Sequence, residues 1–155
     1  MESTDPTAVL ARNRVVNQLG GYLMAIDLNN ILSDNTAGLP LLKVLAENSF
    51  DSVLITDASN EGKIIYANEA FKKLTGHDPK DAIGQTPRIL QGPGTDKKVT
   101  ERLSIALKTG GSFEGKAINY KKDGTPFIMF WRVLPIKVGE KIEAWIAIQR
   151  EGASI

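Results

Sequence analysis

Residues 112–151 contain three β-rich segments separated by very short turns. The segments are SFEGKAINY (112–120), TPFIMFWRVLPIK (125–137) and KIEAWIAIQRE (141–151). Lys122-Asp123-Gly124 is a turn signal of the kind that closes a hairpin, and Val138-Gly139-Glu140 separates the last two segments. Strands joined in this way lie antiparallel beside one another, so the pattern predicts a three-stranded meander.

Two shorter strands and two short helices are expected ahead of the meander. SVLITD (52–57) and KIIYA (63–67) are rich in β-formers and are separated by turn-forming residues. Asn68 is a natural N-cap for a helix that Gly76 ends. DPKDAIG (78–84) favours one further helical turn, with its proline at the first position.

The longest helix is predicted over residues 97–109, with Thr95 or Asp96 as its cap and Gly110-Gly111 at its end. Its inward face is expected to carry Val99, Leu103, Ala106 and Leu107. Helices that interrupt an antiparallel sheet indicate an α+β fold, here a five-stranded antiparallel sheet with short helices on one face. We expect a cavity between the sheet and the helices that suits a small ligand.

Residues 1–38 are expected to form an N-terminal helical extension and linker, and residues 39–155 a separate domain. An apolar stripe in the extension recurs at spacings of three and four, which places its members on one helix face: Val15, Leu19, Tyr22 and Ile26. An isolated helix gains most of its stability from packing, so this stripe must lie against its own sheet or a second chain.

The composition of the 155 residues excludes several classes of function. A formal net charge of +1 argues against nucleic acid or an anionic membrane as the main partner. The absence of cysteine excludes disulfides, thiolate metal sites and cysteine nucleophiles, and a single histidine disfavours a histidine-rich metal site. The apolar run LGGYLMAIDL (19–28) is short and contains Asp27, so it is neither a membrane span nor a signal sequence, and we expect the cytoplasm as the location.

We do not expect the chain to be an enzyme. Its acidic residues often stand at predicted turns and caps, where short acidic side chains are common: Asp57, Asp81, Asp96 and Asp123. No paired carboxylates, no nucleophile beside a base and no phosphate-binding glycine motif stand out in the sequence.

Five motifs carry a family resemblance: VLITD, IIYANEAFKKLTG, GQTPRILQGPGTD, INYKKDG and WIAIQRE. Together they resemble the PAS domain over roughly residues 50–150, and more narrowly the LOV-type branch of flavin-binding blue-light sensors. The resemblance implies a PAS fold and a flavin nucleotide, FMN or FAD, as the cofactor. It assigns seven positions to the flavin site: Thr86, Arg88, Gln91, Asn119, Met129, Trp131 and Gln149.

The resemblance gives four of these positions the residues that the family uses. It implies that Arg88 pairs with the flavin phosphate, which a guanidinium can bind through two hydrogen bonds. Gln91 matches a ribityl contact, and Asn119 matches a hydrogen bond to the pyrimidine edge of the ring. Gln149 matches the amide that senses the ring at N5 and O4, provided that Gln149 shares an inward face with Trp145 and Ala147.

The chain departs from the family at several positions. Pro87 stands in place of the cysteine that forms a sulfur adduct with the flavin, and Thr86 stands in place of an asparagine. Met129 replaces a second pyrimidine-binding asparagine, and Ser104 replaces a second phosphate-binding arginine. Phenylalanine is usual in the family at two positions that hold tryptophan here, Trp131 and Trp145, and we interpret both as core aromatics.

Two hypotheses follow for a LOV-like sensory module that regulates a partner or an output domain. In the first, a flavin is held non-covalently and signals by redox change or photoreduction, without a cysteinyl adduct. In the second, the interior holds another small molecule or only side chains, and the module serves dimerisation. The rival is a ligand-free interaction domain of a larger signalling protein. In the LOV-like family the sheet face and flanking helices commonly form contacts, so we expect a homodimer built from the N-terminal helix and the exposed face of the meander.

Overall fold

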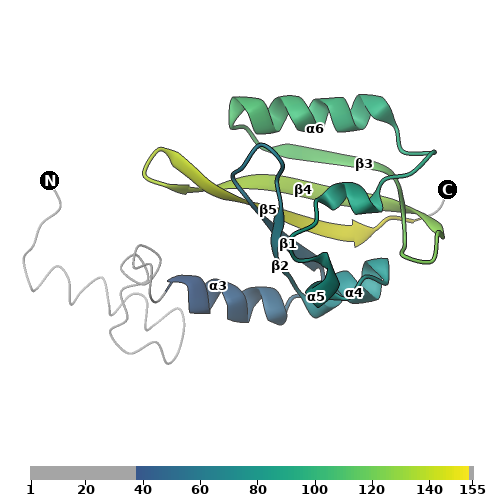
Figure 1. Ribbon diagram of the computed structural model, residues 1–155, viewed down its shortest axis with the longest axis horizontal. Helices are drawn as coiled ribbons and strands as arrows, with labels where there is room; N and C mark the ends of the chain where they lie inside the picture. Colours follow the sequence, from purple (N-terminus) through teal and green to yellow (C-terminus); the bar gives the residue numbers. More distant parts are fainter. Residues whose placement is uncertain (1–37, 154–155) are drawn as a thin grey trace, which may run out of the picture. The chain divides into compact units, whose positions relative to one another are not determined.

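The computed structural model describes residues 38–153, and the order of its strands and of the helices between them agrees with the sequence-based expectation except for one 3₁₀ helix (Figure 1). The elements are α3 (Gly38–Glu47), β1 (Ser52–Asp57), β2 (Ile64–Ala67), α4 (Glu69–Thr75), α5 (Pro79–Ala82), the 3₁₀ helix η1 (Pro87–Leu90), α6 (Lys97–Thr109), β3 (Phe113–Tyr120), β4 (Pro126–Val138) and β5 (Lys141–Glu151). The stripe predicted in the extension, with Val15, Leu19, Tyr22 and Ile26, lies outside the described residues. The boundary between residues 38 and 39 stays a prediction.

The five strands form one antiparallel sheet in the order β2-β1-β5-β4-β3. The meander is confirmed, because β3 pairs with β4 and β4 pairs with β5. On its other edge β5 pairs with β1, which joins the first strand of the fold to the last. The chain therefore has the predicted α+β architecture, a five-stranded antiparallel sheet with helices on one face.

The predicted helix ends are confirmed at α4 and α6. The Asn68 side chain accepts a hydrogen bond from the Phe71 amide at the start of α4, and Gly76 ends the helix at φ 77°, a left-handed value that glycine adopts without strain. Asp96 caps α6 through the Lys98 amide.

The expectation that Leu107 lies on the inward face of α6 is wrong. Leu107 is 39% exposed, whereas Val99, Leu103 and Ala106 pack against the core. An α-helix has about 3.6 residues per turn, so Leu107 points about 100° away from its neighbour Ala106. The inward stripe of α6 therefore ends at Ala106.

Asn68 also connects three segments of the fold. Its Oδ1 accepts hydrogen bonds from the amides of Val53 (2.9 Å) and Phe71 (3.0 Å). Its Nδ2 donates to the carbonyl oxygens of Ala46 (2.8 Å) and Asp51 (3.0 Å). One buried amide therefore fixes the residues before β1, the strand β1 itself and the start of α4.

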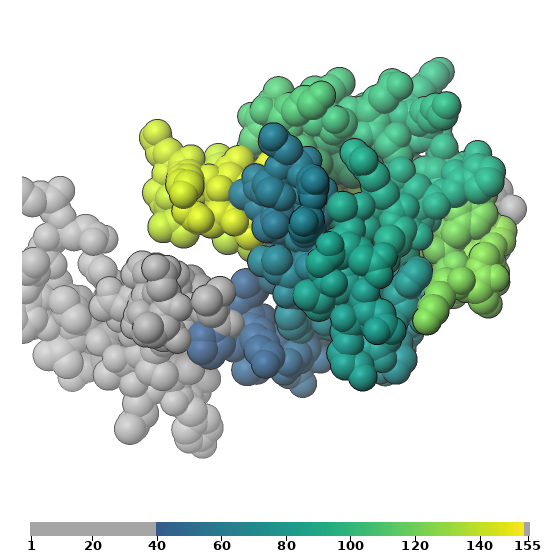
Figure 2. Space-filling model, in the orientation of Figure 1, coloured from purple at the N-terminus to yellow at the C-terminus, as the bar shows by residue number. Residues whose placement is uncertain are grey.

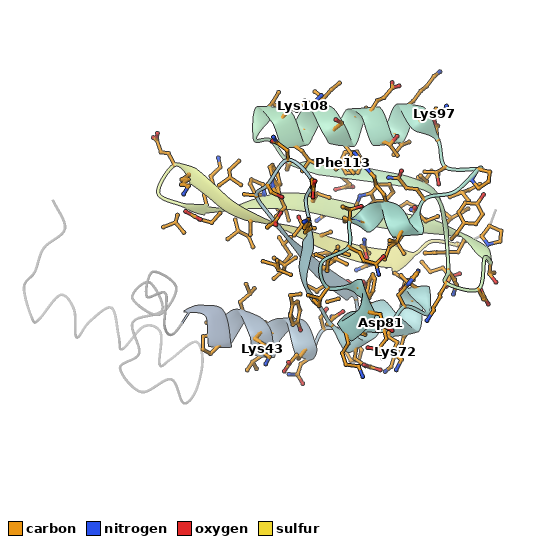
Figure 3. All side chains as sticks on the ribbon, in the orientation of Figure 1. Lys43, Lys72, Asp81, Lys97, Lys108 and Phe113 are labelled. Atoms are coloured by element: carbon orange, nitrogen blue, oxygen red, sulfur yellow. The ribbon has the colours of Figure 1, made fainter. Side chains whose placement is uncertain are left out.

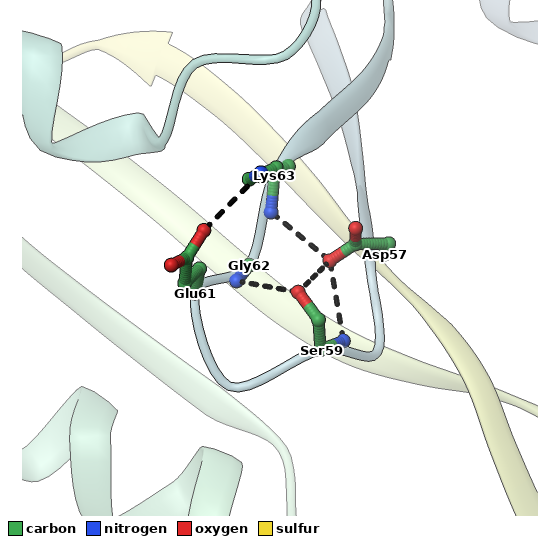
Figure 4. A network of polar contacts seen from close by, with 5 residues as sticks. All are labelled: Asp57, Ser59, Glu61, Gly62 and Lys63. Carbon is green, nitrogen blue, oxygen red and sulfur yellow. Dashed lines mark hydrogen bonds and ion pairs between the residues drawn. The ribbon is translucent and has the colours of Figure 1, made fainter.

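The loop between β1 and β2 satisfies its own polar groups (Figure 4). Asp57 Oδ1 accepts hydrogen bonds from the Ser59 hydroxyl (2.6 Å), the Ser59 amide (3.2 Å) and the Lys63 amide (3.0 Å). The hydrogen bond from the Ser59 side chain is the main cause that lowers the pKa of the Asp57 carboxyl. Lys63 also forms an ion pair with Glu61. These contacts account for the acidic residue at this turn without a catalytic role.

Candidate functional site

The candidate site lies between the inner face of the sheet and the helices that cover it. Phe71 of α4, Ala82 of α5 and Leu90 of η1 are buried in one cluster with the inward residues of the sheet. Figure 1 shows these helices on one side of the sheet, and Figure 2 shows their atoms closing over it from the same direction. Any small-molecule site of the kind expected from the sequence must be built here.

Four of the seven predicted site residues come together on this inner face. Asn119 of β3, Met129 and Trp131 of β4 and Gln149 of β5 are all buried. Trp131 is paired directly with Gln149 across the β4–β5 ladder, while Met129 is paired with Ala117 of β3. The side chains of these residues therefore form one continuous surface over the three strands of the meander.

The two amides on this surface differ in their hydrogen bonding. Gln149 is 3% exposed, and its Oε1 accepts a hydrogen bond from the Ser52 hydroxyl at 3.0 Å. Asn119 is also 3% exposed, but the enclosed side-chain polar atom that lacks a hydrogen-bond partner among residues 38–153 is the Tyr66 hydroxyl, not the Asn119 amide. Buried polar groups are usually hydrogen-bonded, so the role of Asn119 toward a ligand stays a prediction.

Gln149 lies on the inward face, as the sequence analysis required for it to take part in a site. Trp145 is buried in the core cluster and Ala147 packs against it, and Gln149 follows at the same two-residue spacing. Trp131 belongs to the same cluster, so both tryptophans are core aromatics as interpreted from the sequence.

The other three predicted residues belong to the segment around η1 and are not part of this buried group. Thr86 is the residue directly before η1, and its side chain forms no capping hydrogen bond with this helix. Both Arg88 and Gln91 are exposed. Within the described part of the chain, Arg88 forms no ion pair or side-chain hydrogen bond. An exposed, unpaired guanidinium is available to an anion from solvent, and the roles of Thr86, Arg88 and Gln91 stay predictions.

The loop after η1 is held against β3 by residues that the sequence analysis did not single out. Tyr120 Oη accepts a hydrogen bond from the Gly94 amide at 2.8 Å, and Thr95 Oγ1 donates to the Ile118 carbonyl at 2.8 Å. A Cβ atom at Gly92 would lie only 2.4 Å from the Tyr120 ring, so the glycine allows the backbone to lie directly on that ring. The two glycines of QGPG could have indicated this contact in the sequence, because glycine often occurs where the backbone lies close to another part of the protein.

Phe113 and Gly115 form a second feature that the sequence analysis missed. Gly115 faces Trp131 across the β3–β4 ladder, and a Cβ atom at Gly115 would lie 2.6 Å from Cζ of Phe113. The Phe113 ring therefore covers Gly115 and meets Trp131, with ring centroids 5.2 Å apart. Figure 3 shows Phe113 beneath α6, while Lys97 and Lys108 point away from the sheet at the ends of that helix.

Two of the hollows on the described residues lie away from the space between the sheet and the helices. One, of about 420 Å³, lies on the outer face and is lined mainly by Asp51, Glu114, Phe130, Arg132, Ile148 and Arg150. The other, of about 280 Å³, lies at the sheet edge beside Ile118 and Ile128. The interior cavity expected from the fold class stays a prediction, and packed side chains line the inner face of the sheet.

Burial shifts the pKa values of two described side chains, Tyr66 and His77. Burial raises the pKa of the Tyr66 hydroxyl, with a further contribution from the charge of Glu47, and burial lowers the pKa of His77, to which Lys122 adds. Neither lies in a cluster of acids, bases and nucleophiles, and residues 38–153 hold no group of three side chains suited to a metal ion. No helix in the same part of the chain has the length and apolar character needed to cross a membrane.

Comparisons with known proteins agree with this architecture. Residues 51–151 match the PAS domain family. Phototropin-2 of Oryza sativa subsp. japonica is 39% identical over 100 residues, which are 63% of this chain and 11% of that protein. The blue-light-activated histidine kinase of Brucella anthropi is 46% identical over 77 residues, which are 50% of this chain and 16% of the kinase. The chain therefore spans less than a fifth of the length of these two relatives.

A solved structure supports the same relationship. The LOV domain from the blue-light activated histidine kinase of Erythrobacter litoralis shares the fold with a TM-score of 0.64 and 30% sequence identity. The match covers 67% of this chain and 97% of that domain. The part of the fold held in common thus includes nearly the whole of a LOV domain.

Proposed function

Because the chain belongs to the LOV-like branch of the PAS domain family, we propose that it acts as a sensory and regulatory module whose interior is filled by its own side chains. The module transmits a signal to an output domain or partner protein in the cytoplasm and is not itself an enzyme. The observation that carries the proposal is the packed inner face, where Phe113 and Trp131 meet over Gly115.

The polar residues of the site fit a flavin in part. Asn119 and Gln149 are both buried on the inner face, and Gln149 accepts a hydrogen bond from the Ser52 hydroxyl through its Oε1. Arg88 is exposed, so its guanidinium is accessible to a phosphate group. These observations support a non-covalent flavin nucleotide as the second candidate.

The packing of side chains on the inner face does not favour a flavin. Ligand pockets typically have volumes of about 300–1,000 Å³. Neither of the two hollows lies over the inner face, which is covered by Met129, Trp131 and the Phe113 ring. A sulfur adduct is excluded in any case, since the sequence contains no cysteine and Pro87 stands at the position concerned. We therefore assign no signalling step to a flavin.

The absorption spectrum of the purified full chain separates these two candidates. We expect the protein to be colourless, with the absorption of its tryptophans and tyrosines and no band in the blue. Heating the protein and analysing the released small molecules by mass spectrometry provides the control for a colourless ligand. A yellow protein that releases FMN or FAD would replace the filled interior with the flavin hypothesis.

We propose a homodimer as the form in which the module works, with the outer face of the meander in the interface. Phe130 is 41% exposed on this face, and Ile118 and Leu134 beside it are exposed as well. Two ion pairs flank the apolar residues, Glu114–Arg132 (2.7 Å) and Asp51–Arg150 (2.6 Å). In a two-fold dimer the same patch of both subunits meets, so the acidic residues of one subunit can lie opposite the basic residues of the other. The contribution predicted for the N-terminal stripe concerns residues outside the described part.

We expect Phe130→Asp to convert a dimer of the full chain to a monomer, because it places a charge in the apolar centre of the interface. Light scattering at several protein concentrations measures the change. Val138→Asp is the matched control, since Val138 is 57% exposed on the same strand but lies at the hairpin end. A wild-type chain that is monomeric, or a Phe130→Asp protein that stays dimeric, contradicts the proposed interface.

A further inference from the structure

The Phe130 ring lies against the residue that directly follows β5. Phe130 is on the outer face of β4, where it is paired with Lys116 of β3 and with Arg150 of β5. A Cβ atom at Gly152 would overlap Cδ2 and Cε2 of the Phe130 ring and would lie 3.2 Å from Cγ2 of Ile128. Because glycine has no side chain, the ring rests directly on the Gly152 backbone.

This contact lies at a hydrogen bond just beyond the end of β5. The Gly152 amide donates to the Ile128 carbonyl at 2.8 Å, one residue after Glu151 is paired with Met129. Hydrogen bonds at the end of a ladder open more readily than those in its middle, since a neighbouring pair supports them on one side only. The Phe130 ring covers Gly152 at this bond, so we expect the position of the ring to affect how often the bond opens.

The same ring is open to solvent on its other side. Phe130 is 41% exposed, and the Lys116 ammonium lies 5.7 Å from the centroid of its ring. Exposed side chains change rotamer rapidly, so the ring can leave Gly152 without disturbing the core. A second copy on the interface proposed above covers the exposed side of the ring and restricts this motion.

We propose that Phe130 couples dimerisation of the module to the hydrogen bond between Gly152 and Ile128. In the dimer the partner subunit holds the ring against Gly152, and the bond stays closed. In the monomer the ring moves away more often, and the bond opens more often. Such coupling is reciprocal, so a change that displaces the ring from Gly152 also weakens the dimer. This inference rests on the homodimer proposed above.

The first measurement compares dimerisation of the full-length wild type, Gly152→Ala and Gly111→Ala by analytical ultracentrifugation over a range of concentrations. Gly152 does not have a positive φ, so alanine fits its backbone and the new methyl group has to push the ring aside. Gly111→Ala is the matched control, because its Cβ atom would meet only Thr109 Oγ1 at 3.8 Å. We expect the dimer of Gly152→Ala to dissociate with a Kd raised about tenfold or more, and that of Gly111→Ala to be unchanged.

The second measurement is hydrogen–deuterium exchange of the wild type at concentrations above and below its dimer Kd, read at single residues by electron-transfer fragmentation. We expect the Gly152 amide to exchange about fivefold or more slowly in the dimer, which is the size of a typical coupling. The Gly124 amide is the control, because it donates to the Lys121 carbonyl at 2.9 Å in the β3–β4 turn and does not contact Phe130. Its exchange should be the same in monomer and dimer.

A wild type that is monomeric at every concentration overturns the homodimer and the inference together. If the wild type is dimeric, an equal Kd for wild type and Gly152→Ala overturns the inference alone and leaves the interface intact. Equal weakening by Gly152→Ala and Gly111→Ala also overturns it, because it indicates a general effect of an added methyl group. Equal exchange of the Gly152 amide in monomer and dimer overturns it as well. If circular dichroism shows that Gly152→Ala is unfolded, the exchange of the wild type decides by itself.

Discussion

Replacement of Asn68 by alanine will lower the free energy of unfolding by about 4 kcal/mol, because each buried group left without its partner costs roughly 1–3 kcal/mol. Asn68 is 2% exposed and makes four hydrogen bonds to main-chain groups. Alanine supplies none of them, so the Val53 amide and the Asp51 carbonyl lose this partner. The Phe71 amide keeps the Asn68 carbonyl (3.2 Å), and the Ala46 carbonyl keeps the Ser49 amide (3.2 Å). Urea unfolding followed by tryptophan fluorescence measures the change, since Trp131 and Trp145 are both in the core.

Asp96→Ala is the control that separates capping from cross-linking. Asp96 also caps a helix, but its side chain accepts one hydrogen bond, from the Lys98 amide at an exposed site. The loss of such a cap typically costs about 1 kcal/mol. If Asn68→Ala costs no more than Asp96→Ala, then the hydrogen bonds from Asn68 to Ala46 and Asp51 do not stabilise the fold.

Local sequence signals were sufficient to predict most of the fold. Caps such as Asn68 and Asp96, and turns such as Lys122-Asp123-Gly124, act within a few residues and do not depend on the rest of the chain. The 3₁₀ helix η1 was missed because it has four residues and no side-chain cap at Thr86. Leu107 was wrongly assigned to the inward face because it is apolar and directly follows Ala106, the last inward residue of the helix. Residue type alone does not distinguish it from the inward residues.

The content of the interior could not be predicted in the same way, because it depends on contacts between distant segments. Ser52 and Gln149 are 97 residues apart in the sequence but share a hydrogen bond, which the β1–β5 register creates. The covering of Gly115 by Phe113 likewise depends on a side-chain orientation that the pattern of apolar residues leaves open. Residue types at Asn119 and Gln149 therefore indicated a ligand site, while the side chains that pack beside them could not be read from the sequence pattern.

Gly92→Ala will lower the free energy of unfolding by about 2 kcal/mol, as is usual when an added group overpacks a close contact. The new Cβ atom would lie 2.4 Å from Cδ2 and Cε2 of Tyr120, well inside van der Waals contact. Either the ring or the loop must then move, and the loop is also held by Gly94 and Thr95. Thermal or urea unfolding of the full chain measures the loss.

Two further variants show whether the contact with Tyr120 is the cause. Gly111→Ala is the control, because its Cβ atom would meet only Thr109 Oγ1 at 3.8 Å, and we expect a change within about 1 kcal/mol of wild type. In the double variant Gly92→Ala/Tyr120→Ala the obstructing ring is absent. Its loss of unfolding free energy should therefore be smaller than the sum of the losses in the two single variants. The difference should exceed about 0.5 kcal/mol, because independent sites are additive within that limit. If the losses of the two single variants are additive, Gly92→Ala destabilises the protein through the loop backbone and not through contact with the Tyr120 ring. In that case the backbone conformation of the segment that carries Arg88 and Gln91, and not its contact with β3, would determine its position.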